Sequence, residues 1–367
     1  MKRSVLAAGL LLAACSQGQP DPARPTATPS ATASTPNSAP ASAPLPRDDH
    51  AIPRPGEQKT FRDWTVACDN VRTCAMASLG TGADFPRVTI QVTRAAGPAG
   101  AVEIALASPQ DDVPPPAALA IDGRRFTVAG DGLSGPSAAA LARALVEARA
   151  IEVLDGRGAR IATVSPAGAS AALRYIDAEQ QRAGTVTAFV ARGERPGAAI
   201  LGAAALPRVR SVAFSGTAAT LPPALLAAMA RTARCDPPLP GQAPRAHALA
   251  DGATLVLLPC SSGAYNEIDA LFVVRDGKAE PAQVDAPSGF EETGADSGTP
   301  VHSVINGDVD GGVLTSYAKG RGLGDCGVRQ SFVWDGTRLR LVEQQSMGEC
   351  RGNPNYLTVW RARVVRE

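Results

Sequence analysis

Cysteine is the residue type of this sequence best suited to covalent chemistry, because its thiol forms disulfides, binds metals and acts as a nucleophile. Six of the seven cysteines lie after residue 60 and fall into three sequence-local pairs. Six cysteines allow 15 connectivities, and we predict the local one. A catalytic thiol needs an unpaired cysteine beside a histidine, and the even number leaves no such cysteine evident. The predicted disulfides are Cys68–Cys74, Cys235–Cys260 and Cys326–Cys350.

Histidines are scarce, which limits the enzymatic chemistry open to the chain. His247 and His302 are the two in the region that we expect to fold. No C-x-x-C pair accompanies them, so a zinc ion would lack ligands, and no G-x-S-x-G, Walker or dinucleotide glycine motif occurs. We therefore assign no catalytic residue and no cofactor. Catalysis by a pair of carboxylates, acting as general acid and general base, is kept as an alternative.

One segment matches the first half of a calcium loop. Asn306, Asp308 and Asp310 place oxygen ligands at alternate positions, and Gly311 occupies the sixth position. Tyr317 stands where such loops carry a bidentate glutamate, so the strongest ligand is missing. Asparagine, aspartate and glycine are equally typical of a plain hairpin turn, which is the alternative to a calcium site.

A glycine-dense block at residues 319–327 includes a cysteine that we expect to form a disulfide. Glycine permits positive φ and close backbone approach, so the block indicates a turn with a fixed shape. We favour a structural turn whose charges pair with one another, and the alternative is a polar patch that binds an anionic or carbohydrate ligand. Residues 260–266, with Tyr265 and Asn266, allow the same two interpretations. The patch consists of Lys319, Arg321, Asp325 and Arg351.

The N-terminus has the layout of a secretory signal. Lys2 and Arg3 precede an apolar stretch at residues 4–12, which is too short to cross a bilayer as a helix. Leu-Ala-Ala-Cys at residues 12–15 resembles the lipobox of bacterial lipoprotein precursors. The resemblance implies cleavage before Cys15, attachment of diacylglycerol to its thiol, and acylation of the new amine with a fatty acid such as palmitate. An ordinary cleaved signal with a chance cysteine is the alternative.

Residues 15–58 are predicted to form a lipidated, disordered tether. The stretch from Ser16 to Gln58 has no aromatic residue and holds ten of the 31 prolines, so it cannot bury enough apolar surface to offset the ordering of its backbone. At about 3.1 Å per residue its full reach is on the order of 130 Å. Aspartate after the cysteine would resemble an inner-membrane retention signal. Because Ser16 stands there, we expect the outer membrane, with the protein facing the periplasm.

Charge and hydropathy exclude further partners. The 367-residue chain carries 36 Lys and Arg against 35 Asp and Glu, a formal net charge of +1. Binding to nucleic acid requires a concentrated positive face, so we expect no nucleic-acid partner. No apolar run approaches the roughly 20 residues that span a bilayer as a helix. We therefore expect the N-terminal lipid to provide the contact with the membrane.

Hydrophobic periodicity predicts an α+β fold for the rest of the chain. The first half is expected to be β-rich with two or three helices, among them one at residues 137–149 and one capped by Ser165 with Pro166 in its first turn. A strand is predicted at residues 185–191, and short strands with glycine turns predict a mainly antiparallel second half. The predicted parts are a signal peptide at 1–14, a tether at 15–58, an α+β domain at 59–195, a junction at 196–221 and a β-rich domain at 222–367.

Several sequence blocks between about residues 61 and 363 carry a resemblance to a known family. They are Trp64–Asn70 with Cys74, Tyr175–Asp177 with Gln181–Arg182, Cys260–Asn266, Lys319–Gly327, Trp334–Gly336 and Glu349–Gly352. In this order they resemble domain-of-unknown-function family 1176, a group of bacterial envelope proteins, and the resemblance implies no activity. The first block alone also resembles the invasion-associated locus B family, exported proteins with a β-rich domain.

These observations predict a non-enzymatic lipoprotein of the outer membrane that binds an envelope protein or a glycan. The first alternative is a periplasmic hydrolase that uses carboxylates on peptidoglycan or glycan. The second is calcium-dependent adhesion through the loop at residues 306–311.

Overall fold

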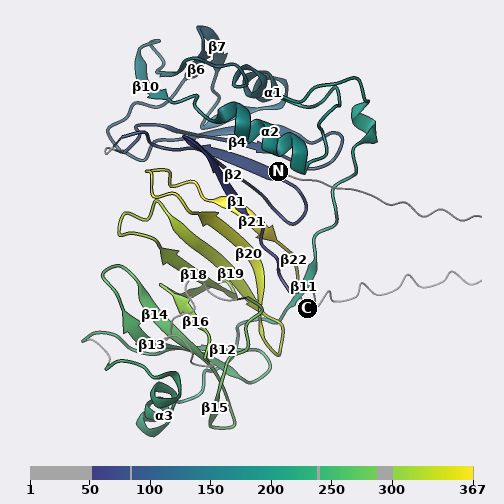
Figure 1. Ribbon diagram of the computed structural model, residues 1–367. Coiled ribbons are helices and arrows are strands. Elements are labelled where there is room, and N and C mark those ends of the chain that lie inside the picture. The colour runs from purple at the N-terminus through teal and green to yellow at the C-terminus, as the bar shows by residue number, and fades with distance from the viewer. Residues whose placement is uncertain (1–51, 83–84, 238–239, 287–300, 367) are drawn as a thin grey trace, which may run out of the picture. The chain divides into compact units, whose positions relative to one another are not determined.

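The structure is a computed structural model of the chain, shown in Figure 1. Contacts group Pro46–Glu367 into one compact unit. The predicted signal peptide, the predicted lipidation site Cys15 and most of the predicted tether lie outside the described residues. No helix in the described part has the length and apolar character needed to cross a membrane. The described residues are 52–82, 85–237, 240–286 and 301–366.

A six-stranded antiparallel sheet opens the fold, and its first five strands form a meander. Buried and more exposed residues alternate along Val102–Ala107, which is the pattern expected of a strand with one face towards the core. In order across the sheet the strands are β1 (Gln58–Phe61), β2 (Trp64–Cys68), β3 (Cys74–Ser78), β4 (Thr89–Arg94), β5 (Val102–Ala107) and β8 (Gly132–Ser134).

A four-stranded antiparallel sheet and two helices complete the first half. Asp122 and Gly123 both have positive φ in the turn between two of its strands, as the Asp-Gly sequence predicts. Trp64, Leu119, Leu141 and Leu173 meet in one apolar core that both sheets and both helices share. These elements are β10 (Arg160–Val164), β9 (Ile151–Leu154), β6 (Ala118–Ile121) and β7 (Arg124–Thr127), with α1 (Gly135–Ala144) and α2 (Ala169–Glu179).

Three predictions in this half need correction. The first helix is Gly135–Ala144, shorter than the predicted 137–149. The second helix is capped by Gly168, because the hydroxyl of Ser165 instead accepts a hydrogen bond from the backbone N–H of Ala167 (3.2 Å) in a turn before the helix. The strand predicted at residues 185–191 is wrong, because a buried carboxylate takes up backbone N–H groups there, as described below.

The second half is built mainly from antiparallel strands in two five-stranded sheets, with one helix. A separate two-stranded ribbon is parallel. The first sheet contains β12 (Arg245–Ala248), β13 (Thr254–Ser262), β14 (Glu267–Arg275) and β15 (Lys278–Pro281), with β16 (Ser303–Ile305) paired to β14. The second contains β17 (Asp308–Asp310), β18 (Val313–Lys319), β19 (Gly327–Trp334), β20 (Leu339–Met347) and β21 (Leu357–Arg361). The remaining elements are α3 (Pro223–Ala233), a 3-10 turn at Gly197–Ala199, β11 (Arg208–Ser211) and β22 (Arg363–Arg366).

One apolar cluster joins residues from both halves. Every residue of β2 and β3 is buried, so these strands have a covered surface on each side of the sheet. Trp64 faces the core of the first half, whereas Ala67 and Ala77 contact Leu357 and Val359 of β21 in the shared cluster. Alanine has a short side chain, which allows the backbones of the two sheets to approach closely.

The fold class is α+β, as predicted: antiparallel sheets dominate and two of the three described α-helices lie in the first half. The described cysteines form the same three disulfides that sequence-local pairing predicts: Cys68–Cys74, Cys235–Cys260 and Cys326–Cys350. Disulfides persist in oxidising compartments, so these bonds are consistent with an extracytoplasmic location.

Candidate functional site

The glycine-dense block forms the loop between β18 and β19, and several bonds fix its shape. The Cys326–Cys350 disulfide holds the end of the loop, and the N–H of Gly320 donates to the carbonyl of Cys326 (2.8 Å). The hydroxyl of Tyr317 donates to the carbonyl of Gly324 (2.6 Å). Gly327 has a φ of +136°, and a Cβ there would lie 2.0 Å from the carbonyl oxygen of Ala318. The disulfide and the hydrogen bonds therefore fix the loop in a single conformation, and this conformation requires glycine at position 327.

Two charges of the predicted patch pair with each other inside this loop. Arg321 donates from Nε and Nη2 to the two carboxylate oxygens of Asp325 at 2.7 and 2.6 Å. Asp325 is 2% exposed and also accepts the backbone N–H of Gly352 (2.6 Å). Burial raises the pKa of Asp325, but the hydrogen bonds from Arg321 and Gly352 outweigh it and hold the pKa below its usual value. The carboxylate is thus ionised and fixed.

Arg351 points away from the loop surface and towards the first half of the chain. Its guanidinium donates to the carbonyls of Gly80 (2.8 Å) and Arg62 (2.7 Å) and forms an ion pair with Asp63 (2.5 Å). Burial raises the pKa of Asp63, but the hydrogen bonds from Ser165 and Arg351 and the charge of Arg351 outweigh burial and hold the pKa below its usual value. Arg351 therefore holds the two halves together.

Beside the loop, the rings of Tyr317 and Tyr356 contact the cationic side chains of Arg329 and Lys319. The sequence analysis did not predict this cluster. The guanidinium of Arg329 lies 4.5 Å from the ring centre of Tyr317 and 4.3 Å from that of Tyr356. Lys319 Nζ lies 5.5 Å from the Tyr317 ring. Burial and Tyr317 raise the pKa of Tyr356. The sequence signal that was available is Tyr317 two residues before Lys319, on the same face of a strand; the pairing of Tyr317 with Arg329 is seen only in the structure.

The exposed part of this region combines apolar and cationic side chains. Leu323 is 64% exposed and Tyr265 is 40% exposed, and the Tyr265 hydroxyl donates to the carbonyl of Gly320 (3.2 Å). The side chain of Arg321 stays 39% exposed despite its ion pair. We call Tyr265, Lys319, Arg321 and Leu323 the glycine-loop face.

Asn306, the first of the predicted calcium ligands, makes hydrogen bonds beside this loop. The side-chain amide of Asn306 donates to the carbonyl of Tyr317 (2.9 Å), and its oxygen accepts the N–H of Glu267 (3.0 Å). Asp308 and Asp310 are exposed at the two ends of β17. Within the described ranges no group of three or more His, Cys, Asp or Glu side chains is placed to hold a metal ion. Asn306 thus fixes neighbouring loops to one another.

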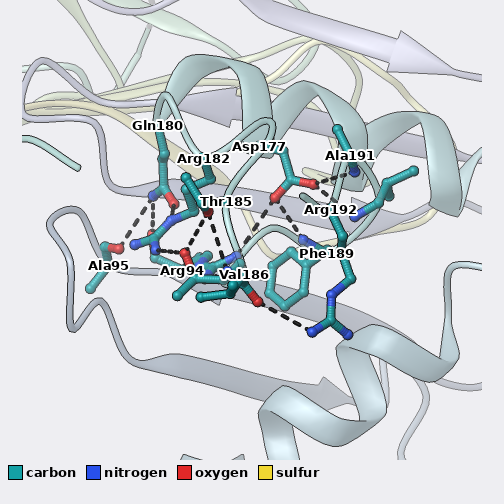
Figure 2. Close-up of polar contacts among 12 residues, drawn as sticks. Arg94, Ala95, Asp177, Gln180, Arg182, Thr185, Val186, Phe189, Ala191 and Arg192 are labelled. Carbon is teal, nitrogen blue, oxygen red and sulfur yellow. Dashed lines mark hydrogen bonds and ion pairs between the residues drawn. The ribbon is translucent and has the colours of Figure 1, made fainter. Parts of the chain in front are cut away.

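A second cluster of charges lies under the loop Thr185–Arg192 in the first half (Figure 2). Asp177 of α2 is fully buried, and its carboxylate accepts the backbone N–H groups of Phe189 (2.9 Å), Val190 (2.7 Å) and Ala191 (3.2 Å). A buried backbone N–H needs a partner. In a β-sheet that partner is a carbonyl of the neighbouring strand, whereas here it is the Asp177 carboxylate.

Two arginines surround Asp177 in this cluster. Arg182 is fully buried, and its guanidinium donates to the carbonyl of Gly97 (2.5 Å). Arg94 Nη1 lies 3.7 Å from Asp177 Oδ1, and its guanidinium carbon lies 4.1 Å from the Phe189 ring centre. Burial, with a contribution from Arg182, lowers the pKa of Arg94 to about 9 against the opposing effect of Asp177, so Arg94 stays charged at neutral pH.

A third charged group lies in the first five-stranded sheet of the second half. Asp269 of β14 has a fully buried side chain that forms an ion pair with Arg245 of β12, and Glu267 lies 3.5 Å from the same guanidinium. Burial raises the pKa of Asp269 to about 6, although Arg245 opposes this. Burial and Arg245 lower the pKa of His247.

Open surface hollows offer room for a small ligand elsewhere. One of about 560 Å³ is lined by Glu103, Asp131 and several hydroxyl side chains from both sheets of the first half and from α1. Another of about 390 Å³ is lined by Arg275, Glu280 and Trp334. The first of these hollows has two carboxylates, those of Glu103 and Asp131, in its lining.

Comparison with known proteins finds one family and one distant relative. The model of the family described as "Protein of unknown function (DUF1176)" matches residues 58–363. The uncharacterized protein YpfG of Escherichia coli (strain K12) is 28% identical to this chain over 339 residues, which cover 83% of this chain and 93% of that protein. No solved structure matches the chain.

Proposed function

This chain belongs to the DUF1176 family, and from that premise we propose that it works as a lipid-anchored binding protein of the bacterial envelope. The three disulfides support an exported protein. The Leu-Ala-Ala-Cys sequence before residue 16 supports an anchor at Cys15 in the outer membrane, facing the periplasm. The resemblance of the first block to the invasion-associated locus B family stays a prediction.

The binding surface that we propose is the glycine-loop face, and one observation carries it. Leu323 is 64% exposed on a loop whose backbone is held by a disulfide and internal hydrogen bonds. A loop that is already ordered loses little conformational entropy when it binds, so less of the free energy gained by burying its exposed apolar groups is offset. Tyr265 and Arg321 beside it supply the aromatic and cationic groups that are frequent in binding hot spots.

A photo-crosslinking experiment in intact cells tests this surface. A benzophenone side chain at Leu323 is expected to give one reproducible adduct, which is weakened when Tyr265→Ala is added. The same group at Leu201, which is 63% exposed and lies outside the glycine-loop face, is the matched control. Digestion of the adduct with protease or with a peptidoglycan hydrolase then distinguishes a protein partner from a glycan. Absence of an adduct, or the same adducts from both positions, would contradict the proposal.

The membrane anchor is tested separately. Metabolic labelling with palmitate is expected to mark the wild-type chain and to leave Cys15→Ser unlabelled. An unlabelled wild type would remove the anchor from the proposal and leave the binding surface unaffected.

One observation favours the alternative of a carboxylate-dependent hydrolase. Glu103 and Asp131 line the same hollow of about 560 Å³. If they act as acid and base, purified protein cleaves peptidoglycan or glycan fragments, and Glu103→Gln abolishes the cleavage. Undetectable cleavage by the wild type contradicts this alternative.

A further inference from the structure

A hollow of about 240 Å³ opens in the first half of the chain, beside the glycine-loop face. Its wall consists of residues 78–82, of Phe85 and Pro86, and of residues 163–165 at the end of β10. Pockets for drug-sized ligands have volumes of roughly 300–1,000 Å³. The hollow therefore has room for one small unit of a longer chain.

Hydrogen bonds hold the wall of the hollow in place. The backbone N–H of Gly80 donates to the carbonyl of Arg351 (2.8 Å), and the Arg351 guanidinium donates to the carbonyl of Gly80 (2.8 Å). On the other side, the side-chain amide of Gln110 donates to the carbonyl of Phe85 (2.9 Å). Because these groups are already ordered, a ligand that binds here loses little affinity to the ordering of the wall.

The hydrogen-bonding groups that the hollow offers are neutral. Thr81 and Thr163 are exposed, and neither hydroxyl has a partner within the described part of the chain. None of the described residues that line the hollow has a charged side chain. A hydroxyl both donates and accepts hydrogen bonds. The wall is therefore complementary to a ligand whose own polar groups are neutral, whereas a buried phosphate or carboxylate would find no counter-charge.

Phe85 links the hollow to the glycine-loop face. The guanidinium carbon of Arg321 lies 5.6 Å from the centre of the Phe85 ring. Arg321 uses Nε and Nη2 to bind Asp325, and its Nη1 has no partner among the described residues. An aromatic ring and a free N–H donor thus lie where the hollow adjoins the glycine-loop face.

We infer that this hollow binds one sugar unit of a glycan chain that continues onto the glycine-loop face. The hydroxyl groups of a sugar are neutral and both donate and accept, as the wall requires. The C–H groups of a sugar ring pack against the negative face of an aromatic ring, here Phe85. An apolar side chain of a protein partner would leave the hydroxyls of Thr81 and Thr163 without partners. The inference rests on the proposed function, because it names the partner of the surface proposed there.

Binding of soluble glycan strands tests the inference. The strands are released from peptidoglycan with an amidase, and the peptides that the amidase removes are the second probe. Each probe is titrated into the purified full chain carrying Cys15→Ser, and the affinity is measured by calorimetry. The variants are Thr163→Val and Phe85→Ala in the hollow. The matched control is Thr127→Val, because Thr127 is also an exposed threonine of a strand but lines the hollow of about 560 Å³.

We expect the strands to bind and the peptides not to bind. Thr163→Val should weaken the binding of strands about fivefold, as expected for the loss of one hydrogen bond. Phe85→Ala should weaken it about tenfold or more, because a buried aromatic contact is lost. Thr127→Val should bind the strands as before. Valine is favoured in strands, so Thr163→Val keeps the test valid even if melting temperatures show that Phe85→Ala does not fold.

The inference would be overturned if the strands did not bind, if the peptides bound instead, or if Thr163→Val and Thr127→Val had equal effects. A protease-sensitive adduct from Leu323, together with absence of strand binding, would identify a protein partner and leave the proposed function intact. Strand binding without any adduct from Leu323 would instead contradict the glycine-loop face. The failure of the inference and the failure of the proposed function are therefore distinguishable.

Discussion

Two clusters of arginine and aspartate in this protein differ in how far their charged side chains are exposed to solvent. The cluster around Asp177 is sealed: Asp177 and Arg182 are fully buried beneath the Thr185–Arg192 loop. The glycine loop buries Asp325 but leaves the side chain of Arg321 39% exposed. In the first cluster the carboxylate satisfies backbone N–H groups, whereas in the second it orients a cation at the surface.

This difference separates charges that maintain the fold from charges available for binding. Removing one member of a buried ion pair leaves an uncompensated charge and is costly. An exposed pair is screened by water and contributes little to stability. Stability measurements on the two clusters, together with Asp269 as a buried carboxylate of the second half, therefore test the assignment of roles.

The largest effect is expected at Asp177. Asp177→Ala leaves three backbone N–H groups of the loop without their acceptor and Arg94 without its counter-charge. We expect a loss of about 3–5 kcal/mol in the free energy of unfolding, measured with urea. The control is Asp155→Ala, because Asp155 also accepts backbone N–H groups but in an exposed turn. Equal losses in both variants would contradict a special role of burial.

Asp269 is expected to give an intermediate, pH-dependent effect. Burial raises its pKa to about 6 in the folded chain from 3.8, so the folded state binds more protons between these values. Its contribution to stability is therefore complete below about pH 4 and is lost as the pH rises through about 6. Relative to Asp269→Asn, we expect the wild type to lose about 2–3 kcal/mol between pH 4 and pH 7. The prediction would be contradicted if the unfolding free energy of the wild type minus that of Asp269→Asn stayed constant or rose between pH 4 and pH 7.

The smallest effect is expected at Arg321. Arg321→Gln removes a pair whose cation is partly exposed, while Gly352 still donates to Asp325. The free energy of unfolding should fall by about 1–2 kcal/mol, measured by thermal unfolding, because Asp325 is buried but Arg321 is partly exposed. The photo-crosslink from Leu323 should weaken far more than stability does. A loss as large as that of Asp177→Ala would show that Arg321 serves the fold rather than binding.

Local features of the fold were predictable from the sequence. The three disulfides join neighbouring cysteines, and the Asp122-Gly123 turn has the positive φ values that its residues favour. The α+β class and the antiparallel hairpins are confirmed, because alternation and turn residues act over short distances. The identification of the family by sequence blocks is confirmed for residues 58–363.

Features that depend on distant partners were not predictable. The strand expected at residues 185–191 is absent because Asp177 binds its N–H groups. Arg351 was expected on the loop surface but points to Asp63, far away in sequence. No local signal shows which of several carboxylates an arginine will meet. The parallel pairing of β11 with β22 is equally non-local.

The sequence by itself determined the chemistry that each residue carries and the conformations of its turns. Glycines at 324 and 327 permit a loop with positive φ, and cysteines near one another close short disulfide loops. Only the tertiary structure decided which charges are sealed and which reach solvent. Burial depends on side chains that come from remote segments, so Asp177 became a structural acceptor, whereas Arg321 and Arg363 stay at the surface.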